Sequence, residues 1–128
     1  MKLGWVILYV PDVAAALDFY ERAFGLARRF VHESGTYAEM ETGATALAFA
    51  AEPLAVDHGI TLRVSRPGEN PAAVEIALTT DDVDAAWSRA TEAGASAVKP
   101  PEKKPWGQTV AWVRDLNGAL VELCTPMG

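Results

Sequence analysis

Residues that bind metals or form disulfides are scarce in this sequence, which contains one cysteine and two histidines among 128 residues. A single cysteine, Cys124, excludes an internal disulfide and a thiolate metal cluster. It lies in an apolar stretch, which predicts a core residue. His32 lies on a predicted strand and His58 in a predicted loop. We expect surface roles rather than metal ligation for both.

Basic clusters and long apolar runs are also missing. No basic run is longer than Lys103-Lys104 and the formal net charge is −6, so we expect no nucleic-acid partner. The negative charge favours cationic small molecules, although a surface kept in solution by carboxylates is the commoner explanation. No apolar run approaches ~18 residues and the N-terminal segment does not resemble a signal peptide. We therefore expect a cytoplasmic protein without a membrane partner.

What is present fits one small globular domain. Half of the residues are hydrophobic and 22% are charged, an ordinary balance for a folded chain. At 128 residues, the length is typical of a single domain with its own core. The prediction is one domain over residues 1–128.

The first part of the chain predicts a βαβββ unit over about residues 1–50. Residues 3–10 form an apolar strand that stops at Pro11-Asp12, and Asp12 is a helix N-cap. Apolar residues at helical spacing follow as far as Gly25, which ends the helix. Three strands then follow, at about residues 28–33, 36–42 and 45–50, separated by turn signals.

The same order returns over about residues 74–128. A strand at residues 74–79 leads to the N-cap Asp82 and to a helix closed by Gly94, and strands follow at residues 108–114 and 119–124. A shift of 70 residues superposes Asp12 on Asp82, which indicates an internal repeat. The proline-rich residues 99–104 are expected to form a stiff loop. Residues 51–73 are expected to be a linker, in which residues 59–64 could add a strand.

Several short motifs resemble the glyoxalase, bleomycin-resistance and extradiol-dioxygenase group, also called the vicinal oxygen chelate superfamily. Each motif is weak alone, but their order and spacing cover nearly the whole chain. The motifs are Leu8-Tyr9-Val10-Pro11-Asp12-Val13, Phe19-Tyr20, Phe24-Gly25-Leu26, Asp82-Val83-Asp84-Ala85-Ala86, Pro105-Trp106-Gly107-Gln108 and Arg114-Asp115-Leu116-Asn117-Gly118-Ala119-Leu120-Val121-Glu122-Leu123.

This resemblance implies an α+β fold of two βαβββ modules, with a curled mixed sheet around a concave cleft, and a homodimer. It also implies four metal-ligand positions, one on the first and one on the last strand of each module. In this sequence they are Trp5, Ala48, Glu75 and Glu122. Tryptophan and alanine donate no lone pair to a metal, so we expect no metal cofactor. A hard cation between Glu75 and Glu122 is the minority alternative.

A ligand-binding surface is the other expectation. Alternation along the first strand places Trp5, Ile7 and Tyr9 on one face, and small residues on the last strand of the first module leave room beside them. Aromatic residues at such positions either contact a ligand or stabilise a dimer. The candidate ligand-binding residues are Trp5, Ile7, Tyr9, Ala46, Ala48, Glu75, Trp106, Trp112 and Glu122.

Two functions from different classes follow. The first is a small-molecule-binding or sequestering protein that holds a planar aromatic or cationic compound, similar to the antibiotic-resistance members of the family. The second is an enzyme of the same superfamily, a lyase, isomerase or dioxygenase. It would use either a divalent metal or Glu75 and Glu122 as acid and base. Fold alone does not separate them.

Overall fold

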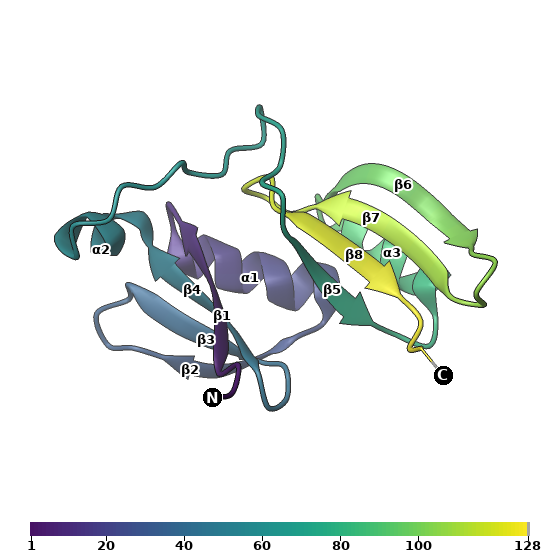
Figure 1. Ribbon diagram of the computed structural model, residues 1–128, viewed down its shortest axis with the longest axis horizontal. Helices are drawn as coiled ribbons and strands as arrows, with labels where there is room; N and C mark the ends of the chain where they lie inside the picture. Colours follow the sequence, from purple (N-terminus) through teal and green to yellow (C-terminus); the bar gives the residue numbers. More distant parts are fainter. Residues whose placement is uncertain (128) are drawn as a thin grey trace. The chain divides into compact units, whose positions relative to one another are not determined.

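The computed structural model describes residues 1–127 and divides into two compact units, Met1–Val64 and Ser65–Gly128. Each unit has a four-stranded mixed sheet with one long helix behind it (Figure 1). The predicted α+β fold with two βαβββ repeats is confirmed. In residues 1–127, no helix has both the length and the apolar character needed to span a membrane.

In the first unit, β1 (Trp5–Val10) leads into α1 (Val13–Phe24). The Asp12 carboxylate accepts a hydrogen bond from the backbone N–H of Ala15 at 3.0 Å, and Gly25 ends the helix with φ 67°. The antiparallel strands β2 (Ala27–Val31), β3 (Tyr37–Glu41) and β4 (Ala46–Ala51) follow, and β4 pairs in parallel with β1. The sheet order is β1-β4-β3-β2.

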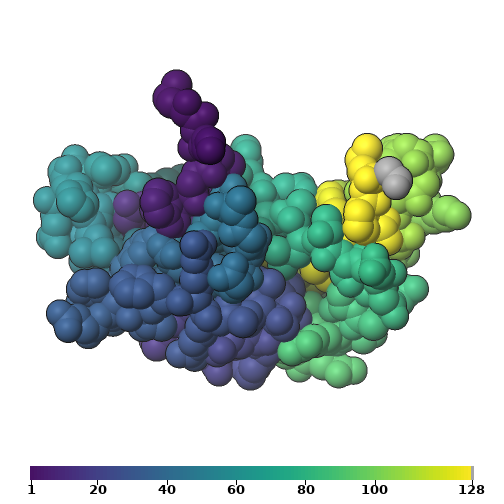
Figure 2. Space-filling model, turned by 90° about the horizontal axis from the view of Figure 1, so that it is seen from below, coloured from purple at the N-terminus to yellow at the C-terminus, as the bar shows by residue number. Residues whose placement is uncertain are grey.

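The core of the first unit lies between α1 and the back of this sheet. Tyr20 of α1 packs on Phe49 of β4, with ring centroids 4.9 Å apart, and both side chains are fully buried. We call the other face of the sheet, opposite α1, the open face. Figure 2 shows the N-terminal residues before β1, in dark purple, extending away from the unit.

The second unit repeats this plan. It contains β5 (Glu75–Thr79), α3 (Val83–Glu92), β6 (Ser96–Lys103), β7 (Thr109–Arg114) and β8 (Leu120–Cys124), in the sheet order β5-β8-β7-β6. Asp82 caps α3 through the N–H of Ala85 at 3.0 Å, as Asp12 caps α1. Cys124 is buried, as expected. The helical spacing of Val83, Trp87 and Ala90 predicts that Trp87 of α3 lies in the core, but this side chain is only partly buried.

Three local predictions are wrong. Residues 52–57 of the expected linker form the short helix α2 (Glu52–Asp57), because Pro53 in a first turn is compatible with a helix. Residues 60–64 are not in a strand. The expected loop at residues 99–104 lies largely in β6, where Pro100 and Pro101 are tolerated because β6 is an edge strand with two register shifts.

Candidate functional site

The open face of the first sheet has a row of alanines along its middle strand. The pairing register sets Trp5 beside Ala46, Ile7 beside Ala48, and Glu39 of β3 on the other side of Ala48. Trp5 and Ile7 are 56% and 42% exposed, whereas Val10, on the other face of β1, is buried. The predicted facing of β1 is therefore confirmed. The residues of this face on the three strands are Trp5, Ile7, Tyr9, Ala46, Ala48, Ala50, Tyr37 and Glu39.

Glu39 connects the aromatic residues of this face. The indole Nε1–H of Trp5 donates to Glu39 Oε2 at 2.9 Å, and the Tyr37 hydroxyl donates to the same oxygen at 2.8 Å. Trp5 and Glu39 lie on strands separated by β4, about 9.6 Å apart at ordinary strand spacing. Only small side chains on β4 allow this hydrogen bond. Ala46 and Ala48 thus make room for the indole of Trp5.

The Tyr37 hydroxyl stays neutral over the physiological pH range. Burial, together with the hydrogen bond to Glu39 and the charge of that carboxylate, raises the pKa of Tyr37 to about 12. The hydroxyl proton therefore remains on the tyrosine. Glu39 itself is mostly covered, with a side chain 14% exposed.

A bulge in β2 adds two more side chains to the open face. The pairing of β2 with β3 shifts between Arg28 and Phe30, so that Phe30 lies opposite Glu39. The Phe30 ring lies 6.4 Å from the Tyr37 ring, centroid to centroid. Arg29 Nε lies 3.9 Å from Glu39 Oε1 and 3.8 Å from Glu41 Oε2. The result is a carboxylate surrounded by aromatic rings, with one arginine beside it.

The open face of the second sheet carries the acidic residues named by sequence. Glu122 of β8 lies between Ala77 of β5 and Trp112 of β7, and Glu75 is two residues before Ala77 on the same face. The indole of Trp112 donates to Glu75 Oε1 at 3.2 Å. Strand pairing therefore brings Glu75, Trp112 and Glu122 together on one face of the second sheet.

Glu122 is held in an environment that disfavours its charge. Burial raises the pKa of the Glu122 carboxyl, the charge of Glu75 raises it further, and the Cys124 thiol acts in the opposite direction. Burial also raises the pKa of Cys124 to about 11, with Glu122 and Glu75 adding to the effect. Two neighbouring carboxyls and a neutral thiol thus occupy one strip of the second sheet.

The two open faces carry the same hydrogen bond with its partners exchanged. In the first unit, Ile7 lies opposite Ala48, and Trp5 lies two residues before Ile7. In the second unit, Ala77 lies opposite Glu122, and Glu75 lies two residues before Ala77. Glu39 and Trp112 lie directly opposite Ala48 and Glu122, respectively. In the first unit tryptophan is on the first strand and glutamate on the third, and in the second unit the order is reversed. The register also supports the equivalence of Ala48 and Glu122 assumed from sequence.

Other residues singled out by sequence lie elsewhere. Trp106 is in the turn between β6 and β7, 63% exposed, and its indole donates to Gln108 at 2.9 Å. No hydrogen bond within residues 1–127 connects it to Glu75 or Glu122. His32 and His58 are exposed, and His32 Nδ1 contacts the Ser34 hydroxyl at 2.7 Å in a local turn.

Sequence reasoning missed Glu39, Tyr37 and Phe30. The alternation of Tyr37, Glu39 and Glu41 on a predicted strand was a usable signal, since these residues must share one face. What sequence did not contain was the bulge in β2 and the register that sets β3 opposite Ala48. Glu39 is therefore a site residue recognised only from the fold.

The residues at the four ligand positions do not fit a catalytic metal. Such a site needs about three protein donors and an open position. Here Trp5 and Ala48 offer no lone pair, and Glu75 accepts the Trp112 N–H. Among residues 1–127, neither unit gathers three or more histidine, cysteine, aspartate or glutamate side chains that could hold a metal ion.

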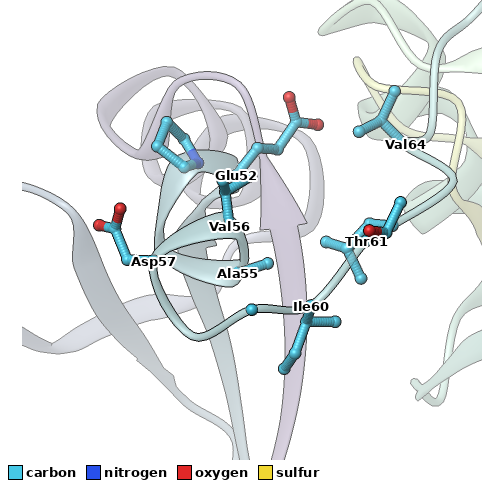
Figure 3. A pocket seen from close by; sticks show the side chains of 10 residues that line it. Glu52, Ala55, Val56, Asp57, Ile60, Thr61 and Val64 are labelled. Atoms are coloured by element: carbon cyan, nitrogen blue, oxygen red, sulfur yellow. The ribbon is translucent and has the colours of Figure 1, made fainter.

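A hollow of about 650 Å³ lies elsewhere in the first unit, between α2 and the extended residues that follow it (Figure 3). Its walls are mainly apolar, with Val56 on α2 and Ile60 on the segment after it, and Glu52 and Asp57 belong to its lining. The volume is in the range of small-molecule pockets. It has no aromatic side chain, unlike the open face. The full lining is Glu52, Pro53, Ala55, Val56, Asp57, Gly59, Ile60, Thr61, Leu62 and Val64.

Comparison with known sequences decides the family. The model of the Glyoxalase/Bleomycin resistance protein/Dioxygenase superfamily matches residues 2–123. The chain belongs to this superfamily. Two of its similar relatives are uncharacterised proteins: YraH of Bacillus subtilis, 26% identical over 96% of this chain and 97% of its own, and Rv0887c of Mycobacterium tuberculosis, 31% identical over 94% and 72%.

Several solved structures have the same fold. A glyoxalase-related enzyme from Fulvimarina pelagi is 21% identical, with a TM-score of 0.82 over 98% of this chain and 88% of its own. TioX from Micromonospora sp. ML1 is 28% identical, with a TM-score of 0.74 over 98% of both chains. A superfamily member from Sphaerobacter thermophilus is 26% identical, with a TM-score of 0.73 over 98% of both chains. The superfamily includes enzymes as well as binding proteins, so the side chains must indicate the activity.

Proposed function

We propose that this member of the glyoxalase/bleomycin resistance superfamily is a small-molecule-binding protein that holds a planar aromatic or cationic compound. The observation that carries the proposal is the hydrogen bond of Trp5 to Glu39 across Ala48. It places an indole and an alanine where a metal enzyme of this fold needs two donors. Aromatic and carboxylate groups on an open sheet face are suited to a flat or cationic ligand.

Exposure of the aromatic groups supports the same function. Trp5 and Phe30 are 56% and 47% exposed, and large apolar side chains that are left uncovered often mark a binding surface. The second sheet has its own tryptophan beside Glu75 and Glu122. Each open face thus offers a flat apolar group next to a negative charge.

The proposal is tested by elemental analysis and a ligand screen on the purified protein. We expect no stoichiometric transition metal after dialysis. We also expect planar or cationic compounds to shift the indole N–H signals of Trp5 or Trp112 in ¹H–¹⁵N NMR spectra. One tightly held zinc, nickel or iron ion per chain would contradict the proposal, as would a diverse screen in which no compound shifts these signals.

One observation favours an enzyme as the second candidate. Glu75 and Glu122 are neighbours on one face, and the pKa of Glu122 is raised by burial and by Glu75, an arrangement suited to a proton donor beside an acceptor. A glutamate-based lyase or isomerase would lose turnover in Glu122→Gln while still binding its substrate. A binding protein would show no turnover of any compound that it binds.

A further inference from the structure

Within residues 1–127, the hydrogen bonds from Trp5 and Tyr37 to the Glu39 carboxylate both go to the same one of its two oxygens. Oε2 accepts hydrogen bonds from Trp5 at 2.9 Å and from Tyr37 at 2.8 Å. Both donors are neutral, so they orient the carboxylate without neutralising its negative charge. Oε1 faces Arg29, whose Nε is 3.9 Å away, too far for a hydrogen bond. A mostly covered carboxylate therefore retains one oxygen available to a donor.

Arg29 shows from which side a cation approaches this oxygen. Its side chain is 45% exposed, and its Nε is shared between Glu39 at 3.9 Å and Glu41 at 3.8 Å. Arg29 is well exposed and makes no hydrogen bond at these distances, so each ion pair contributes little stability. Displacing Arg29 from Glu39 towards Glu41 therefore costs little. A ligand cation with better geometry would replace it.

Aromatic rings complete the surroundings. Phe30 lies opposite Glu39 in the strand register, its ring contacts Tyr37, and Trp5 reaches the carboxylate from the other side. A planar cation at this place is attracted by the faces of the aromatic rings as well as by the negative charge of the carboxylate. The N–H groups of such a cation would donate to Oε1.

We propose that Glu39 is the charge-recognition residue of the first unit's open face, and that its ligand is a planar aromatic cation with N–H donors, such as an aryl amidinium or guanidinium. The cation takes the place beside Oε1 that Arg29 now holds. This inference rests on the proposed binding function and specifies its ligand class. It assigns recognition to a residue outside the four ligand positions of the family.

The test uses two probes of nearly equal shape, the benzamidinium cation and neutral benzamide. Both are titrated into ¹⁵N-labelled full-length protein at neutral pH, and the four indole N–H signals are followed after assignment by Trp→Phe variants. We expect benzamidinium to shift the Trp5 signal and to bind at least about 10-fold more tightly than benzamide, the size of a charge-assisted hydrogen bond.

The variants separate recognition from general charge. Glu39→Gln keeps an acceptor for Trp5 and should weaken benzamidinium at least about 10-fold. Glu41→Gln is the matched control, because it removes the same charge from the same strand and should change affinity less than about 2-fold. Arg29→Gln should tighten binding, since it removes the internal competitor. If Glu39 had a purely structural role, Arg29→Gln would not increase the affinity for benzamidinium.

Each other outcome overturns the inference in a recognisable way. If benzamide binds as tightly as benzamidinium, or if Glu41→Gln weakens binding as much as Glu39→Gln, Glu39 does not recognise charge. If benzamidinium shifts only Trp106 or Trp112 and depends on Glu75, the inference fails while the binding function stands. If neither probe and no compound of the wider screen shifts any indole signal, the proposed function fails as well.

Discussion

Gly118, in the turn between β7 and β8, is a position where a single added methyl group should be damaging. Its φ is +86°, and a Cβ added there would lie 2.5 Å from Arg114 Nη2 and 2.6 Å from the backbone oxygen of Arg66. Arg114 holds this region together, because Nε donates to the Gly118 oxygen at 2.9 Å, and Nη1 and Nη2 donate to the carbonyls of Pro67 and Arg66 at 3.2 and 3.3 Å.

The expected cost of Gly118→Ala has two parts. The left-handed backbone costs alanine about 1–2 kcal/mol. Moving Arg114 or Arg66 out of contact loses at least one charge-assisted hydrogen bond, about 1.5–3 kcal/mol. The total is about 2.5–5 kcal/mol, a large fraction of the stability of a small domain. Gly107→Ala is the matched control, because φ is +100° and a Cβ there meets nothing within 4 Å. It should cost only the backbone part.

Urea unfolding followed by tryptophan fluorescence measures both variants. In a Trp5→Phe background the remaining tryptophans all belong to the second unit, so the signal reports the part of the chain that contains both glycines. With ordinary urea m-values, Gly118→Ala should lower the midpoint by about 2 M, clearly more than Gly107→Ala does. Equal shifts for the two variants would refute the role given to Arg114 and Arg66.

Three further predictions concern the second sheet and the assembly. Folding raises the pKa of Glu122, so the folded state binds the Glu122 proton more tightly than the unfolded state does. The free energy of unfolding should therefore fall as the pH rises from the pKa of Glu122 in the unfolded state through its pKa in the folded state. Urea midpoints of Glu122→Gln, measured over the same pH range, should not show this fall. Cys124 is buried and has a pKa of about 11, so roughly one thiol in a thousand is ionised at pH 8. It should therefore react with iodoacetamide at pH 8 only when the protein unfolds. Rapid labelling of the native protein, measured by mass spectrometry, would contradict its burial. We expect a homodimer, because both sheets have open edge strands, and a monomer mass in light scattering at micromolar concentration would contradict this.

Local signals explain how much of the fold could be predicted. Asp12 and Asp82 each cap a helix through the N–H three residues on, and that short-range chemistry is visible in sequence. Strand alternation likewise predicted that Trp5 and Ile7 share a face. These features depend on neighbours within a few residues, so the order of elements followed from them.

The rest depended on contacts between distant segments. Trp5 and Glu39 are 34 residues apart, and Trp112 and Glu75 are 37 apart. Their hydrogen bonds exist only because of the strand order and register. The bulge in β2 that sets Phe30 opposite Glu39 cannot be predicted from the amino-acid composition of the strand. Residues 99–104 are wrongly predicted as a loop because proline usually indicates a loop, and only the sheet order shows that β6 is an edge strand, where proline is tolerated.

The prolines of β6 also affect how copies of this chain meet at high concentration. Pro100 and Pro101 have no backbone N–H, and the pairing of β6 with β7 shifts twice. A second polypeptide approaching this edge finds missing donors and an interrupted backbone spacing, so it cannot extend the sheet there. The outer edge of β6 therefore blocks the edge-to-edge growth that leads β proteins to aggregate.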